Sequence, residues 1–172
     1  MKTSFVSLLA GLVLIVAGSL LAHFVETSGG TRISDIRIPM DDGKELSAYL
    51  YVPKSATIDT PAPGILAVHG YINSRETQSS FAIELARRGY AVLTFTPKGA
   101  ERRRKTLKQW EQEARLLIPF GRSQIGVLAD EVLRVSLILG AFDQVDSGRI
   151  GLTDMSLGGW GAWLGMATGS WI

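Results

Sequence analysis

Ser156 stands where a short apolar run meets a glycine-rich segment, and this is a pattern that can do chemistry. The run Arg149 to Thr153 predicts a strand, and it leads through Asp154-Met155 into Ser156-Leu157-Gly158-Gly159. A serine in a tight strand-to-helix turn has its hydroxyl lifted above the sheet, and the next amide faces a developing oxyanion. We therefore predict Ser156 as a nucleophile and the Leu157 amide as an oxyanion donor, the alternative being an ordinary turn serine.

A second polar segment follows an earlier buried strand. The continuous apolar run Gly64 to Val68 ends in His69-Gly70-Tyr71. We expect the second oxyanion amide to come from this segment. For His69 we favour a structural role over direct proton transfer.

The elements that must position these residues alternate between strand and helix patterns. Ile33 to Met40 places Ile36, Ile38 and Met40 on one face, and a turn then leads to a second strand over Leu46 to Val52. Further strand patterns over residues 64–68, 90–96 and 149–153 alternate with helix patterns over residues 76–88, 125–142 and 158–166. This alternation predicts an α/β fold with a mostly parallel sheet in three layers.

The two longest helix patterns have clear faces. In residues 76–88 we expect Phe81, Ala82 and Leu85 to point inward, with Gly89 ending the helix. In residues 125–142 the side chains expected on the solvent side are Asp130, Glu131 and Arg134. Arg149 to Thr153 is expected to be a buried strand.

The N-terminal segment predicts a membrane anchor. Between Lys2 and Glu26 lie 23 residues without a formal charge, and at ~1.5 Å per residue they reach roughly 34 Å, enough to cross a bilayer. A cleaved signal is the alternative, and a buried core helix is a third. We expect an anchor or signal at 1–25, contacting the membrane through residues 5–24, a linker at 26–32, and one domain over 33–172. The lysine before the run places that domain outside the cytoplasm, membrane-anchored or, alternatively, secreted.

Composition excludes several classes of site. The 172 residues contain no cysteine and two histidines, which excludes disulfide scaffolds, thiolate zinc sites and centres with several imidazoles. The net charge of +2 gives no argument for nucleic acid. The basic tract from Lys98 to Lys108 is expected to be a solvated helical face, with an anion or lipid-headgroup patch as the alternative. We expect no metal and no organic cofactor.

The chain resembles the α/β-hydrolase superfamily, in particular bacterial serine hydrolases of the dienelactone-hydrolase and acyl-peptidase-like branch. The likeness covers roughly Ile33 to Met166 and is best over residues 61–95 and 145–162. It implies that Ser156 is the nucleophile, that the amides of Leu157 and Tyr71 form the oxyanion hole, and that His69 supports the loop. The implied activity is hydrolysis of a small-molecule ester or amide through an acyl-enzyme. The alternative is a non-catalytic, membrane-anchored binding protein on the same scaffold.

Two departures from the family pattern bear on activity. The family has glycine two residues before the nucleophile, where this chain has Asp154. The triad order in this fold is serine, then acid, then histidine, whereas His23 and His69 both precede Ser156. We therefore expect an incomplete hydrolase domain, truncated after the helix that follows Ser156, with impaired catalysis.

The same shortening has a structural consequence. The strand before Ser156 is expected to form an open sheet edge, which invites pairing with another chain. Trp160, Trp163 and Trp171 would then lose much of their cover. A partner or a missing C-terminal half is expected to complete this side.

Overall fold

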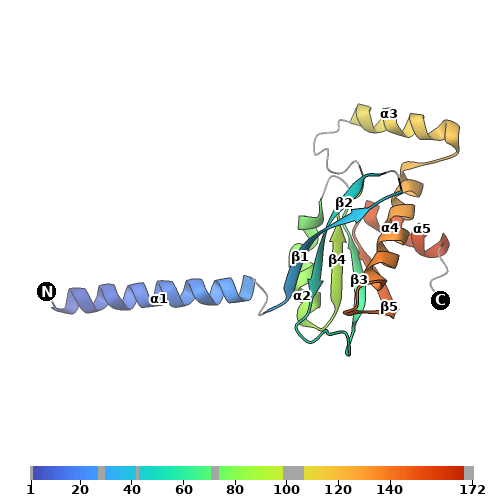
Figure 1. Cartoon of the computed structure of the whole chain (residues 1–172). Coiled ribbons are helices and arrows are strands. Elements are labelled where there is room, and N and C mark those ends of the chain that lie inside the picture. Colours follow the sequence, from blue (N-terminus) through green and yellow to red (C-terminus); the bar gives the residue numbers. More distant parts are fainter. Residues whose placement is uncertain (1, 27–29, 42, 71–73, 99–106, 169–172) are drawn as a thin grey trace.

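A computed structural model of the chain describes all residues except 1, 27–29, 42, 71–73, 99–106 and 169–172. Helix α1 (Lys2–Glu26) stands apart from the rest of the chain (Figure 1). Its segment Val6–Val25 has a mean hydropathy of 2.4 and none of it is buried. Such a helix is long and apolar enough to cross a membrane, and a signal sequence meets the same criterion.

The sheet contains five strands among the described residues: β1 (Arg32–Pro39), β2 (Glu45–Val52), β3 (Ala62–Val68), β4 (Ala91–Phe95) and β5 (Val145–Asp154). Their order is β1-β2-β4-β3-β5. The first two strands form the expected antiparallel hairpin, and β2 is antiparallel to β4. The strands β4, β3 and β5 are parallel. The predicted α/β fold with a mostly parallel core is confirmed.

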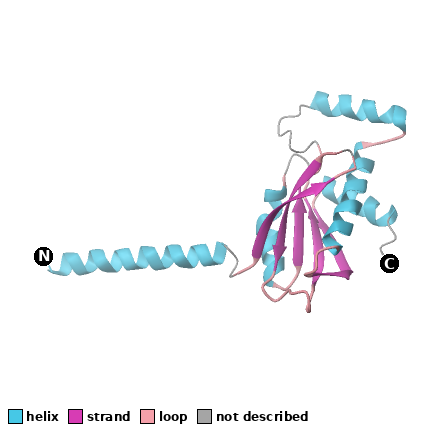
Figure 2. Cartoon of the chain, viewed as in Figure 1, coloured by secondary structure: helices cyan, strands magenta, loops and turns pink. Residues whose placement is uncertain are grey.

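Helices cover both faces of the sheet (Figure 2). The elements besides α1 are η1 (Arg75–Gln78), α2 (Ser79–Arg87), α3 (Leu107–Leu117), η2 (Ile118–Phe120), α4 (Gln124–Gly140) and α5 (Leu157–Thr168). Helix α2 packs on one face and α4 with α5 on the other, which gives three layers. Helix α3 lies beyond the ends of the strands, at the top of Figure 1.

Two apolar clusters fill the layers. The larger lies between the sheet and α4 with α5, and its fully buried side chains include Leu66, Phe95, Val132 and Leu139. The smaller lies under α2. All five residues of β4 are buried, because this strand has neighbours on both edges and helices over both faces. The strand β4 is therefore the most enclosed strand of the sheet.

Two predicted helix faces need correction. Phe81 was expected to point inward, but it is 45% exposed, while Ala82 and Ala86 are buried under α2. The expected helix over residues 76–88 is instead a 3₁₀ turn followed by the shorter α2, and the small side chains of Ala82 and Ala86 let α2 pack closely on the sheet. Glu131 was expected in solvent but is 2% exposed. Its carboxylate accepts a hydrogen bond from the backbone N–H of Lys98, just beyond β4.

The strand β5 is an edge strand, as expected, but the expectation that its residues are buried is wrong. Most of its residues are exposed or half-buried, because its only strand neighbour among the described residues is β3. Trp160 and Trp163 on α5 are 61% and 69% exposed. Both side chains are therefore largely exposed, as expected for this edge of the sheet. Trp171 lies outside the described residues.

Candidate active site

Ser156 lies in the turn between the end of β5 and the start of α5. Its φ is 56°, and it is the one non-glycine residue with a positive φ in the described part of the chain. This conformation is costly for a residue with a side chain, and it persists where the surroundings enforce it. The N–H of Met155 donates to the carbonyl of Val68 at 3.2 Å, and the N–H of Gly158 donates to the carbonyl of Met155 at 3.0 Å. The first bond holds the turn against β3, and the second closes the turn itself.

The glycines around Ser156 allow strand and helix to approach closely. A Cβ on Gly158 would lie 2.6 Å from the carbonyl oxygen of His69 and 2.7 Å from that of Val68. A Cβ on Gly70 would lie 3.2 Å from the Cβ of Ser156. The end of β3 and the turn at Ser156 are therefore in direct contact. A strained serine between a strand and a helix, packed through glycine, is the geometry of a nucleophile elbow.

His69 is buried at the end of β3, with 4% of its surface exposed. Its Nδ1 is 2.7 Å from the carbonyl oxygen of Gly70, so Nδ1 carries the proton and donates. Its Nε2 is buried and makes no hydrogen bond within the described structure, to Ser156 or to any other group. Burial lowers the pKa of His69 below its usual value, which favours the neutral ring. In this arrangement His69 is not poised to take the proton of Ser156.

Of the two predicted oxyanion donors, the structure describes Leu157 but not Tyr71. Leu157 is the first residue of α5, and the N–H groups at a helix N-terminus face anions favourably. Tyr71 lies outside the described residues, so its expected role stays a prediction.

Asp154 lies next to this helix N-terminus. A Cβ on Gly159 would come within 2.6 Å of the Asp154 Oδ1, which places the carboxylate against the first turn of α5. A negative charge there is favourable for the helix. It is unfavourable for an oxyanion forming at the same amides.

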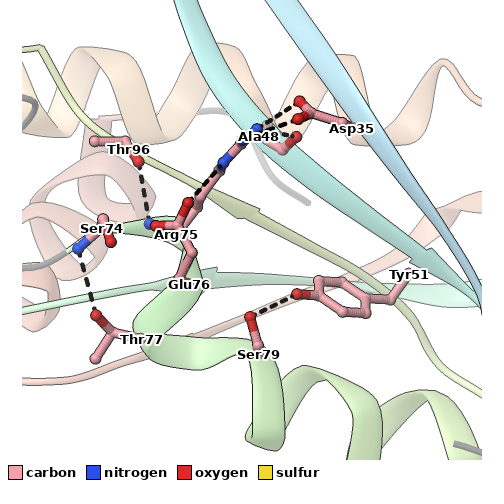
Figure 3. Close-up of polar contacts among 9 residues, drawn as sticks. All are labelled: Asp35, Ala48, Tyr51, Ser74, Arg75, Glu76, Thr77, Ser79 and Thr96. Atoms are coloured by element: carbon pink, nitrogen blue, oxygen red, sulfur yellow. Dashed lines mark hydrogen bonds and ion pairs between the residues drawn. The ribbon is translucent and has the colours of Figure 1, made fainter. Parts of the chain in front are cut away.

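Sequence reasoning missed the polar cluster around Arg75. This side chain is buried at the start of η1, on the segment that leaves β3, and it reaches Asp35 on β1 (Figure 3). No local signal marks it in the sequence, because its partner Asp35 is 40 residues away. No group of three or more histidine or acidic residues that could hold a metal ion occurs among the described residues.

Comparison with known proteins gives structural matches only. No protein-family model matches the sequence, and no curated protein matches it. A dienelactone hydrolase from Anabaena variabilis is 22% identical with a TM-score of 0.56, over 80% of this chain and 57% of that one. A dipeptidyl peptidase 4 from Porphyromonas gingivalis is 18% identical with a TM-score of 0.62, over 82% of this chain and 19% of that one.

A thermostable carboxylesterase from a metagenomic library is 20% identical with a TM-score of 0.54, over 79% of this chain and 41% of its own. The chain spans about half the length of the dienelactone hydrolases that it matches. Strand order, the position of the elbow and these matches agree, and the chain therefore has the fold of the α/β-hydrolase superfamily.

Proposed function

We propose that this chain carries the nucleophile side of a serine hydrolase active site that cleaves an ester or amide through an acyl-enzyme on Ser156. The observation that carries the proposal is the positive φ of Ser156 between β5 and α5. The structural neighbours support a hydrolase in general, since they include a carboxylesterase, dienelactone hydrolases and a peptidase. Substrate and leaving group are left open by these neighbours.

The proposed reaction needs a nucleophile and oxyanion donors, which this chain supplies, and a general base, which we do not find beside Ser156 among the described residues. Ser156 attacks the carbonyl carbon, and the amide of Leu157, with that of Tyr71, holds the oxyanion while the leaving group departs. Water then releases the acyl group. The serine needs a base to remove its proton, and the two histidines of these 172 residues are His23 in α1 and the buried His69. We therefore propose that these residues alone give only trace activity, and that a partner or further chain beside β5 supplies the base.

Attachment to a membrane is the second part of the proposal. We propose that residues 5–24 remain as an uncleaved anchor, with the domain outside the cytoplasm. The length and hydropathy of α1 support a span, and a cleaved signal is the competing interpretation. The test is N-terminal sequencing of the mature protein recovered from the membrane fraction. A mature N-terminus near Ala22 or later would contradict the anchor.

A non-catalytic binding protein is the competing function. The bonding of His69 favours it, since Nδ1 is engaged by Gly70 and Nε2 does not reach Ser156. The carboxylate of Asp154 beside the elbow favours it as well. A binding protein on this scaffold predicts no turnover that depends on Ser156.

Hydrolysis of p-nitrophenyl acetate by the full chain in detergent separates the two functions. A serine without a base attacks slowly, so turnover through Ser156 is expected to be small. We expect trace turnover whose acyl-enzyme component is abolished by Ser156→Ala. The matched control is Ser147→Ala, which alters an exposed serine on the same strand and should leave the rate unchanged. Turnover that is equal in Ser156→Ala would contradict the proposal.

A further inference from the structure

Three cationic side chains lie near the C-terminal end of α1. Arg87, at the end of α2, donates a hydrogen bond to the backbone carbonyl of Val25 in the last turn of α1. Lys54 lies over Gly30, where an added Cβ would meet the Cδ, Cε and Nζ atoms of the lysine. Arg32 is the first residue of β1. All three side chains are exposed, and we call them the helix-end cations.

The chain itself limits how far the helix-end cations can lie from α1. Four residue steps lead from Glu26 to Gly30, and an extended chain spans at most ~3.6 Å per residue, about 14 Å in all. Arg32 follows two residues later and pairs with Val52, so Lys54 is held in the same region. When α1 spans a bilayer, these cations therefore lie at its surface, where lysine and arginine meet the phosphate groups of lipids.

The charges of this corner leave a positive excess among the side chains that the structure describes. Glu84 on α2 pairs with Arg87 at 3.6 Å and with Arg88 at 2.8 Å. Asp59 is the other acidic residue, on the exposed loop between β2 and β3. Two acids thus stand against Arg88 and the three helix-end cations. A surface of this sign is complementary to phosphate groups.

The candidate active site lies at the opposite corner of the sheet. The strands β1 and β5 are the two edges, with α1 joined to β1 and α5 following β5 on the other side (Figure 1). Arg32 lies at the end of the sheet where β4 begins, whereas Ser156 follows the paired ends of β3 and β5. With strands ~4.8 Å apart and ~3.3 Å per residue, the two corners are separated by roughly 25–30 Å.

We propose that the helix-end cations bind the phosphate groups of the bilayer that holds α1, and that this contact turns Ser156 toward water. The proposal rests on the proposed function, since it takes α1 as an anchor and Ser156 as the nucleophile. It assigns the substrate class: the ester or amide that reaches Ser156 is dissolved in water and is not a lipid of the same bilayer. Arg87 contributes twice, because it also joins α2 to the negative end of the α1 dipole.

The exposed tryptophans of α5 define the competing orientation. Trp160 and Trp163 are largely exposed beside the elbow, and tryptophan is enriched where proteins meet the membrane surface. If this side rested on the bilayer, Ser156 would face the lipids. The two orientations place opposite corners of the domain at the membrane.

Site-specific labels distinguish the two orientations, because the chain has no cysteine of its own. Ser55→Cys places one fluorescent label beside Lys54, and Trp160→Cys places one beside the elbow. Each full chain is reconstituted into vesicles of phosphatidylcholine and phosphatidylglycerol, and quenching by a lipid with a spin label on its headgroup is measured. We expect strong quenching at residue 55 and little at residue 160.

The role of the cations is tested by removing two of them. The double variant with Lys54→Gln and Arg87→Gln should weaken the docked orientation at least about tenfold, so that quenching at the two labels becomes more alike. The matched control combines Arg115→Gln on α3 with Arg134→Gln on α4, two paired surface cations away from α1. This control should leave both labels unchanged.

Equal quenching at the two labels, or stronger quenching at residue 160, would overturn the proposal. An unchanged difference in the variant with Lys54→Gln and Arg87→Gln would also overturn it. The substrate class is tested in the same vesicles: fatty acid released from the phospholipids in a Ser156-dependent manner would contradict it. A lack of Ser156-dependent turnover of p-nitrophenyl acetate contradicts the proposed function instead, and it does not alter the quenching.

Discussion

The strands β4 and β5 both run parallel to β3, yet they differ sharply in burial. Every residue of β4 is buried, whereas most of β5 is exposed or half-buried. The β4 sequence (AVLTF) has no charged residue, whereas β5 carries Asp146, Arg149 and Asp154. In addition, β4 has neighbours on both edges and β5 has only β3 within the described structure. Composition and position in the sheet therefore both favour the burial of β4.

The elbow lies on the side with less cover. Its turn is held by β3, through the bond from Met155 to Val68 and the close approach of Gly158. Two tryptophans of α5 remain largely exposed beside it. Within the described structure, the contacts of this turn with the sheet thus come from β3, on the covered side.

The largest expected effect is a difference in the free energy of unfolding between a substitution in β4 and one on the exposed side of α5. Phe95→Ala removes a fully buried ring from β4 and should lower the free energy of unfolding by about 3–5 kcal/mol. Trp163→Ala, at a side chain that is 69% exposed, should change it by less than about 0.5 kcal/mol. Denaturant titration of the full chain in detergent measures both. Equal losses would mean that Trp163 is covered in solution.

An intermediate effect tests the contact between the elbow and β3. Gly158→Ala places a Cβ against the backbone carbonyls of Val68 and His69 and should cost about 1–3 kcal/mol, since neither carbonyl can move aside cheaply. Gly151→Ala is the matched control on β5, where a Cβ meets nothing within 4 Å. The same titration applies. A neutral Gly158→Ala would show that the turn does not pack as described.

The smallest expected effect is on the pH dependence of stability, through the ion pair between Asp35 and Arg75. The hydrogen bond from Arg75 lowers the pKa of Asp35 in the folded chain. A carboxyl with a lowered folded pKa stabilises the fold above its unfolded pKa of ~3.9, and this contribution is lost as the pH falls through the folded value. Asp35→Asn should therefore be less stable than the unmodified chain at pH 6, and the gap should narrow below about pH 4. Melting temperatures across this range measure it, and a constant gap would argue against the linkage.

Much of the fold could be predicted from the sequence because its signals are local. The hairpin follows from alternation between Ile33 and Val52, and the left-handed Gly89 ends the α2 region as expected, with a φ of 93°. Burial that depends on distant partners was not predictable. Phe81 faces solvent while Ala82 and Ala86 of α2 pack against the sheet. Glu131 is buried, and its carboxylate accepts a hydrogen bond from the backbone N–H of Lys98, 33 residues away.

The candidate site was predictable in part. The serine between a strand and glycines marked the turn, and the structure gives it the strained backbone of an elbow. Arg75 was missed because its partner Asp35 is 40 residues away, and no local pattern pairs residues at that distance.

Labelling by a fluorophosphonate probe tests the central claim most directly, namely that Ser156 occupies a nucleophile elbow to which the described residues bring no base. At neutral pH the full chain should react slowly and incompletely, because a serine without a base remains protonated. The little labelling that occurs should be lost in Ser156→Ala and kept in Ser147→Ala. Rapid, stoichiometric labelling abolished by Ser156→Ala would contradict the account, and His69 would then be the first residue to test as the base.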